Sequence, residues 1–203
     1  MNLQQVGMSE EAGAPGAADT RQPPATPQVV GDDRPIVLAG FMGAGKTSVG
    51  RLLAKRLGRR FLDTDEMVEE RIGQGIAGMI RSGDEASFRR AESSAIEAAV
   101  REPRTVIALG GGALVDPRNR DRIVRSAILV HLDVEWATLE RRIEILRGSR
   151  PLLADRSVEE AHELFCDRQR GYEAAHLRVG LGDEAPEEVV EKIVARLYAL
   201  PKQ

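Results

Sequence analysis

Short apolar runs alternate along the chain with segments in which apolar residues recur every three or four positions. The runs predict strands at residues 35–39, 61–62, 105–109, 128–132 and 177–179. The segments between the runs have the spacing of helices with one apolar face. Strands that alternate with helices are typical of a parallel sheet, because each parallel connection needs a crossover. The pattern therefore predicts an α/β fold with helices on both faces of the sheet.

This alternation begins at Arg34. The residues before it are rich in Ala, Gly, Pro, Gln and Thr and show neither the helical nor the strand periodicity. We therefore expect a disordered tail over residues 1–33 that the chemistry does not need. With 203 residues, 42% of them hydrophobic, the chain can bury one good core. Residues 34–203 are therefore predicted to form a single domain.

Composition and charge argue against several classes of protein. The chain has 29 basic and 32 acidic residues, a net charge of −3 and only 3% aromatic residues, whereas nucleic-acid-binding domains usually have a basic surplus. The single cysteine, Cys166, excludes an internal disulfide and is expected to be a small apolar helix residue. No apolar run approaches the ~20 residues that span a bilayer, and the first residues lack the pattern of a secretory signal. We expect a soluble cytoplasmic protein with no nucleic acid or membrane partner.

Candidate chemistry begins directly after the first predicted strand, where residues 40–47 read Gly-Phe-Met-Gly-Ala-Gly-Lys-Thr. Glycines have no Cβ, so the backbone N–H groups of such a loop can wrap closely around the β- and γ-phosphates of a nucleotide. Lys46 would add a cation at the phosphates, and the Thr47 hydroxyl can ligate Mg²⁺. The helix predicted to follow would point its positive N-terminus at the same phosphates. Strand, loop and helix in this order favour a phosphate-binding loop over an ordinary glycine-rich turn.

Two carboxylates follow the second predicted strand, in the segment Leu-Asp-Thr-Asp at residues 62–65. Asp63 could lie near Mg²⁺ while Asp65 accepts a hydrogen bond, or a proton, from a substrate hydroxyl. The alternative is that the Asp and Thr residues of this segment are ordinary N-terminal capping residues of a helix that starts near Glu66.

Two predicted helices carry arginines that could bind an anion. Arg89 and Glu92 share a face of the helix predicted to run from Phe88 to about residue 101, so the carboxylate could orient the guanidinium group; a solvated surface pair is the alternative. Arg168 and Tyr172 share a face of the helix predicted over residues 158–175. Arg168 is either a second anion-binding group or an arginine that reaches the solvent beside a packed tyrosine.

Two loops complete the candidate site. Gly110, Gly111 and Gly112 follow the third strand, where their backbone N–H groups could meet a substrate or the γ-phosphate. Residues 147–149 are polar, and Arg150 follows them, which suggests a flap that closes over the nucleotide and brings Arg150 to the transferred phosphoryl group. A surface loop is the alternative for this segment.

Together these motifs resemble those of the shikimate kinases, a family of small P-loop kinases related in fold to adenylate kinase. The resemblance covers about residues 34–200 and lies in the ordered set GFMGAGKT, LDTD, FRRAE, GGG and RPLL. It implies a three-layer α/β/α fold with a five-stranded parallel sheet in the order 2-3-1-4-5 and a lid around Arg150. It also implies ATP-dependent phosphorylation of the 3-hydroxyl of shikimate, in the chorismate pathway to the aromatic amino acids.

The resemblance further implies roles for individual residues. Catalysis is assigned to Lys46, Asp65 and Arg150. The cofactor Mg²⁺ is assigned to Thr47 and Asp63. Shikimate is assigned to Asp65, Arg89, Gly111, Gly112 and Arg168, with Glu92 orienting Arg89. The remaining substrate, ATP, is assigned to Gly43, Ala44, Gly45, Lys46, Thr47, Ser48, Arg142 and Arg150, with Arg142 near the adenine. The resemblance also suggests a monomer.

The chain departs from the family's usual pattern at four places. Ile80 stands where phenylalanine is usual, Asp84 where glycine is common, and Arg170 where the family has proline. Residues 180–183 read Gly-Leu-Gly-Asp where an Asp-Thr pair is typical. Two alternatives stay open: a kinase of another small polyol acid, such as gluconate or a cyclitol, and a nucleotide-binding regulatory module without turnover.

Overall fold

The computed structural model of the chain describes residues 32–81, 83–146 and 157–201. The predicted tail up to residue 31 lies outside the described residues, as does Arg150 with its predicted lid. The last two residues assigned to the tail are hydrogen-bonded to the domain: the Asp32 carbonyl accepts from Arg59 at 2.7 Å, and the Asp33 carbonyl accepts from the Arg104 backbone N–H at 2.8 Å.

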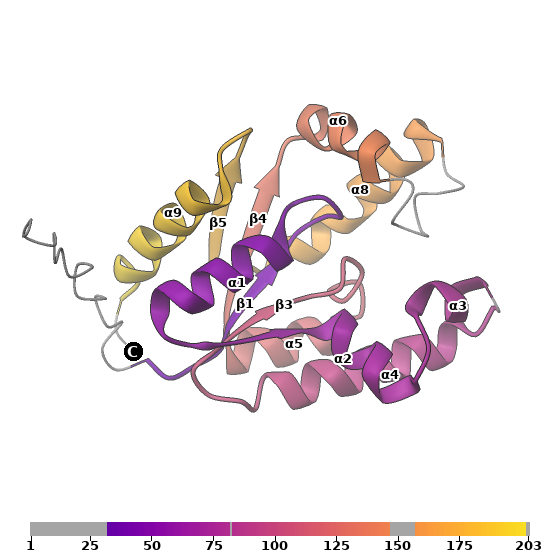
Figure 1. The fold of residues 1–203 in the computed structure, drawn as a ribbon, viewed down its shortest axis with the longest axis horizontal. Coiled ribbons are helices and arrows are strands. Elements are labelled where there is room, and N and C mark those ends of the chain that lie inside the picture. The colour runs from indigo at the N-terminus through magenta and orange to yellow at the C-terminus, as the bar shows by residue number, and fades with distance from the viewer. Residues whose placement is uncertain (1–31, 82, 147–156, 202–203) are drawn as a thin grey trace, which may run out of the picture.

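Five parallel strands form one sheet in the order β2-β3-β1-β4-β5, which confirms the predicted topology (Figure 1). The strands are β1 (Ile36–Ala39), β2 (Arg60–Asp63), β3 (Thr105–Ala108), β4 (Ile128–Val134) and β5 (Leu177–Leu181). The register sets Ala108 of β3 opposite both Leu38 of β1 and Asp63 of β2. The segments that leave these three strands therefore start from the same edge of the sheet.

Eight helices lie in the part of the chain that the structure describes: α1 (Lys46–Leu57), α2 (Thr64–Ile72), α3 (Ile76–Arg81), α4 (Glu85–Ala99), α5 (Pro117–Ser126), α6 (Trp136–Leu146), α8 (Val158–Tyr172) and α9 (Pro186–Tyr198). Helices α1 and α9 pack together on one face of the sheet, and α4 and α5 cover the other (Figure 1). This arrangement confirms the three-layer α/β/α fold.

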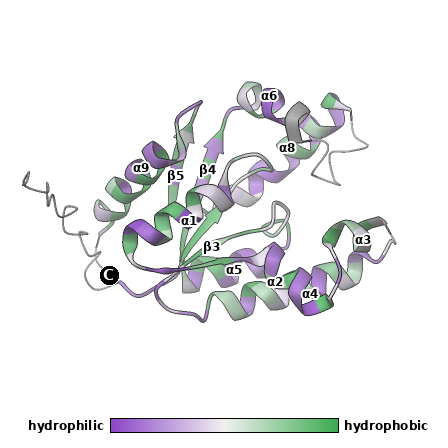
Figure 2. Cartoon of the chain, in the orientation of Figure 1, coloured by the Kyte–Doolittle hydropathy of each residue, from purple (hydrophilic) through white to green (hydrophobic). Residues whose placement is uncertain are grey.

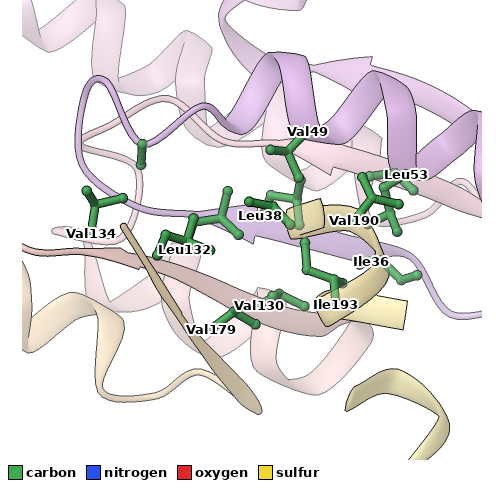
Figure 3. Packing of buried hydrophobic residues seen from close by; sticks show 14 of the residues in the cluster. Ile36, Leu38, Val49, Leu53, Val130, Leu132, Val134, Val179, Val190 and Ile193 are labelled. Carbon is green, nitrogen blue, oxygen red and sulfur yellow. The ribbon is translucent and has the colours of Figure 1, made fainter. Parts of the chain in front are cut away.

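The central strand β1 shows why both faces are covered. Its residues are all at most 2% exposed and alternate between the two layers: Ile36 and Leu38 join the cluster with α1 and α9, and Val37 and Ala39 join the cluster with α4 and α5. Figure 3 shows the first cluster, where side chains of β1, β4 and β5 meet those of α1 and α9. In Figure 2 helix α9 carries both hydrophobic and hydrophilic stretches, as a helix with one buried face does.

The starts of α2 and α4 differ from the predicted ones because side-chain caps set them. Helix α2 begins at Thr64, two residues before the predicted start, since the Asp63 carboxylate caps it by accepting from the Asp65 N–H at 3.0 Å. Helix α4 begins at Glu85 rather than Phe88, because Asp84 accepts from the Ser87 N–H at 3.1 Å. It ends at Ala99, and α8 ends at Tyr172, earlier than predicted.

Two features bear on the expected class of protein. Among the helices of the described residues, none combines the length and the apolar character needed to cross a bilayer. Cys166 lies in α8, as expected, but on its exposed side, with its Sγ 3.7 Å from Nε2 of His162.

Candidate active site

A cavity of about 770 Å³ lies beyond the carboxyl ends of β1, β2 and β3. The predicted motifs that fall within the described residues line it together, although they are far apart in the sequence. Its charged lining residues include Lys46, Asp63, Asp65, Arg89, Glu92, Arg142 and Arg168. This is where open α/β sheets bind ligands, because their loops meet at this edge.

The phosphate-binding loop connects β1 to α1. Gly40, with φ of 153°, allows the chain to leave β1, and a Cβ there would lie 2.7 Å from the Leu132 carbonyl oxygen. The Lys46 ammonium group curves back over the loop and donates to the carbonyl oxygens of Gly40 at 2.9 Å and Phe41 at 3.2 Å. The cation and the start of α1 therefore both lie at the loop, as the motif predicted.

Asp63 connects the loop to the end of β2. Its Oδ2 accepts from the Thr47 hydroxyl at 2.8 Å, and its Oδ1 accepts from the Asp65 N–H at 3.0 Å. The side chain is therefore a helix cap and a neighbour of Thr47 at once, so the two predicted roles do not exclude each other. The hydroxyl and carboxylate oxygens lie side by side, as two oxygen ligands of one cation would.

Arg89 is anchored by a buried carboxylate. Its Nη1 lies 2.9 Å from Oε2 of Glu92, whose side chain is 3% exposed, and its Nη2 lies 3.2 Å from Glu85 at the surface. The alternative of a solvated Arg89–Glu92 pair is therefore wrong. Burial raises the pKa of the Glu92 carboxyl above its usual value, although the Arg89 charge acts against this. Burial lowers the pKa of Arg89, but its two carboxylate partners more than offset this, and the net direction is upward.

Arg168 is buried rather than solvated. The residue is 6% exposed, and its guanidinium carbon lies 5.5 Å from the centre of the Phe41 ring, over its face. The prediction that it might reach the solvent is therefore wrong. Its neighbour Tyr172 is packed as expected, with its hydroxyl 3.4 Å from the Gly111 carbonyl oxygen. Burial raises the pKa of Tyr172 to about 12, so this hydroxyl keeps its proton.

The glycine segment (Gly110, Gly111 and Gly112) is where these charged groups meet. A Cβ on Gly112 would lie 3.0 Å from Nη1 of Arg89 and 3.6 Å from Nη2 of Arg168, so the two guanidinium groups flank the same residue. A Cβ on Gly110 would lie 2.5 Å from Oδ1 of Asp65. Glycine is needed here because the charged side chains approach the backbone itself.

Arg142 connects the phosphate-binding loop to the loop after β5. Its guanidinium group donates to the carbonyl oxygens of Gly43 at 3.2 Å and Gly182 at 2.9 Å. The departure from the family's pattern at residues 180–183 therefore lies beside the proposed adenine region. Among the other loop residues, Gly43, Gly45 and Ser48 line the cavity, whereas Ala44 is buried in the core.

The sequence motifs missed the apolar part of the cavity wall. Met42, Ile76, Ala77, Ile80 and Phe88 line it beside the charged residues. Two of these residues could have been suspected from their positions: Phe88 precedes Arg89, and Met42 lies inside the phosphate-binding loop. Ile76 could not be identified, since the short helix α3 that carries it has no motif, and Ile80 stood out only as a departure from the family's pattern.

Comparison with known proteins shows the family to which this chain is similar. The family model described as shikimate kinase matches residues 42–198. A shikimate kinase of Oceanobacillus iheyensis is 37% identical over 165 residues, or 81% of this chain and 90% of that protein, and one of Bacillus subtilis is 35% identical over 81% of this chain and 89% of that protein.

Comparison with solved structures also finds a similar shikimate kinase. The shikimate kinase of Acinetobacter baumannii in complex with shikimate has a TM-score of 0.77 and 32% identity, and the match covers 82% of this chain and 93% of that one. A gluconokinase of Sinorhizobium meliloti has a TM-score of 0.55 at 20% identity over 82% of this chain and 93% of its own, a likeness in fold alone. The matches in sequence, fold and motif order agree, and the chain belongs to the shikimate kinase family.

Proposed function

We propose that this protein is a shikimate kinase that transfers the γ-phosphoryl group of ATP to the 3-hydroxyl of shikimate, giving shikimate 3-phosphate and ADP in the pathway to chorismate. The observation that carries this proposal is the pair of arginines, Arg89 and Arg168, at Gly112 in the same cavity as Lys46. Two guanidinium groups at one point suit a carboxylate, which accepts paired hydrogen bonds. The relative from Acinetobacter, at 32% identity, was solved with shikimate bound.

The acceptor would lie against the glycine segment. Its carboxylate would pair with Arg89 and Arg168, and its ring would lie near Gly111 and Gly112. Asp65, packed over Gly110, would face the hydroxyl that attacks. A carboxylate in this place can orient the hydroxyl and take its proton as the bond to phosphorus forms.

The nucleotide would bind on the other side of the cavity. Residues of the loop (Gly43, Gly45, Thr47 and Ser48) would hold its phosphates, with Lys46 turning from the loop carbonyls to the β- and γ-phosphate oxygens. Arg142 would lie by the adenine. Arg150, outside the described residues, would reach the transferred group from the lid, a role that rests on the resemblance alone. Positioning and charge neutralisation supply most of the catalysis of phosphoryl transfer.

Thr47 and Asp63 fit the Mg²⁺ ion that accompanies ATP. Their oxygens are 2.8 Å apart, and both are of the hard type that this ion prefers. No group of three or more His, Cys, Asp or Glu side chains suited to a metal occurs among the described residues. The phosphates and water would supply the other ligands of the ion. When bound, the ion would neutralise charge on the phosphate oxygens. We expect a cytoplasmic monomer, as the resemblance to the family suggests.

The test is release of ADP from Mg·ATP with shikimate, with gluconate and without acceptor. We expect turnover with shikimate alone, and phosphorus NMR of the product should place the new ester on the 3-hydroxyl. Turnover on gluconate in preference to shikimate would identify a polyol-acid kinase instead. ATP binding without acceptor-dependent ADP would identify a regulatory module.

A further inference from the structure

The glycine segment is attached at its start to a fully buried threonine. Thr64 is 0% exposed, and its hydroxyl accepts from the Gly110 N–H at 2.9 Å and donates to the Ala108 carbonyl oxygen at 3.3 Å. Thr64 stands between Asp63 and Asp65 in the sequence, and it does not line the cavity. The hydroxyl thus bridges the last residue of β3 and the first residue of the glycine segment.

A hydroxyl suits this place because it both donates and accepts. At the end of β3 the chain turns out of the sheet, so the N–H of Gly110 needs an acceptor from outside the strand ladder. One hydroxyl supplies that acceptor and donates its own hydrogen to Ala108. Valine has the same shape and can do neither.

A second buried side chain holds the other end of the same turn. Asn119 of α5 is 1% exposed, and its amide Nδ2 donates to the carbonyl oxygen of Ala113, the residue after the glycine segment, at 3.3 Å. Thr64 belongs to α2. The segment is therefore held from two helices that lie outside the loop itself.

We propose that Thr64 and Asn119 are positioning residues for the phosphoryl acceptor. They hold the glycine segment at the place where Asp65 packs over Gly110 and the two arginines flank Gly112, and they do so without touching the substrate. This inference rests on the proposed function, since it concerns the same acceptor site. A shift of the segment changes the acceptor side of the cavity directly, whereas Lys46 is held within its own loop by the carbonyl oxygens of Gly40 and Phe41.

The decisive comparison uses three variants at two buried threonines. Thr64→Val removes the hydroxyl and keeps the shape, and Thr64→Ser restores it. Thr105→Val is the matched control, because Thr105 is also 0% exposed and its hydroxyl donates to the Glu102 carbonyl at 2.8 Å, at the opposite end of β3. We expect Thr64→Val to raise the KM for shikimate by about tenfold while the KM for ATP stays within about twofold. Thr64→Ser and Thr105→Val should leave both KM values within about twofold of wild type.

Two outcomes would overturn the inference: equal rises in both KM values for Thr64→Val, or a shikimate KM no higher than that of Thr105→Val. If Thr64→Val does not fold, Asn119→Ala takes its place, with a selective rise in the shikimate KM expected and an unchanged value counting against the inference.

Hydrogen exchange separates this inference from the proposed function, because it needs no substrate. The peptide that contains Gly110 should exchange faster in Thr64→Val than in Thr64→Ser or Thr105→Val. Equal rates would refute the role of Thr64. If the variants show this exchange pattern but the wild-type protein does not phosphorylate shikimate, the proposed function alone is refuted.

Discussion

His131 should make the stability of this domain fall between neutral and mildly acidic pH. The residue lies in β4, is 4% exposed, and its ring stacks on Tyr172 with 4.4 Å between ring centres and 20° between planes. Burial lowers the pKa of His131 from 6.5 to about 4, with Asp133 raising it and Arg178 lowering it further. The folded protein therefore disfavours the charged ring.

The sign and the size follow from linkage. A histidine whose pKa is depressed on folding contributes stability above pH 6.5, and this contribution is lost as pH falls toward its folded pKa of about 4. With these two pKa values the unfolding free energy should fall by about 2 kcal/mol between about pH 7.5 and about pH 5. Other groups act in the same window: burial lowers the pKa of His176, whose Nδ1 accepts from the Leu129 N–H at 2.9 Å.

The assay is urea unfolding of wild type, His131→Phe and His131→Asn at the two pH values. The phenylalanine keeps a ring against Tyr172 and the asparagine keeps a polar group, so the two variants differ in packing but share the loss of the titrating proton. Both should lose about 2 kcal/mol less than wild type on acidification, whatever their stability at neutral pH. The decrease in unfolding free energy that remains in the two variants reports the titration of other groups, such as His176 and the carboxylates. If all three proteins lose the same unfolding free energy on acidification, burial does not keep His131 uncharged, and the reasoning fails.

Steady-state kinetics test the remaining predictions. Lys46→Ala and Asp65→Asn should each lower kcat by about a hundredfold or more, and an unchanged kcat would remove the assigned role. Arg89→Ala should raise the KM for shikimate by about tenfold or more, because the substrate carboxylate loses a charged partner. Arg90 is an exposed neighbour, so Arg90→Ala should have the wild-type KM. Equal KM values in the two variants would argue against the role of Arg89. Gly110→Ala should impair turnover, since its Cβ would lie 2.5 Å from Oδ1 of Asp65. Full activity would show that the glycine segment can move to make room for the added Cβ.

The sheet could be predicted from sequence because its central strands are buried on both faces and read as apolar runs. The strand ends were harder, since Asp133 and Val134 continue β4, and Gly180 and Leu181 continue β5, beyond the predicted apolar runs. Asp133 of β4 and Arg178 of β5 form an ion pair at 2.8 Å, which explains why a carboxylate is tolerated inside a strand. Such a pair depends on neighbours from distant parts of the chain, and no local pattern indicates it.

The candidate site also combines features that local sequence indicates with features that depend on distant residues. The phosphate loop could be predicted because glycine spacing and the Lys-Thr pair carry the chemistry locally, and Arg89 with Glu92 because one helix turn joins them. The burial of Arg168, in α8, could not be predicted, since it depends on Phe41, which lies in the phosphate-binding loop. The contact of Thr64 could not be predicted for a similar reason: its hydroxyl accepts from Gly110, which follows a different strand.

The ion pair of Arg89 with Glu92 is better explained by geometry than by stability. A pair with one buried partner gains little net stability, because removing charges from water offsets much of their attraction. Burial indeed raises the pKa of Glu92, which means that the folded protein works against its charge. What the pair supplies is direction: with Nη1 held by Glu92 and Nη2 by Glu85, the guanidinium plane is set before any substrate arrives. Arg168 is placed by burial over Phe41 instead, so two different physical means orient the two arginines toward Gly112.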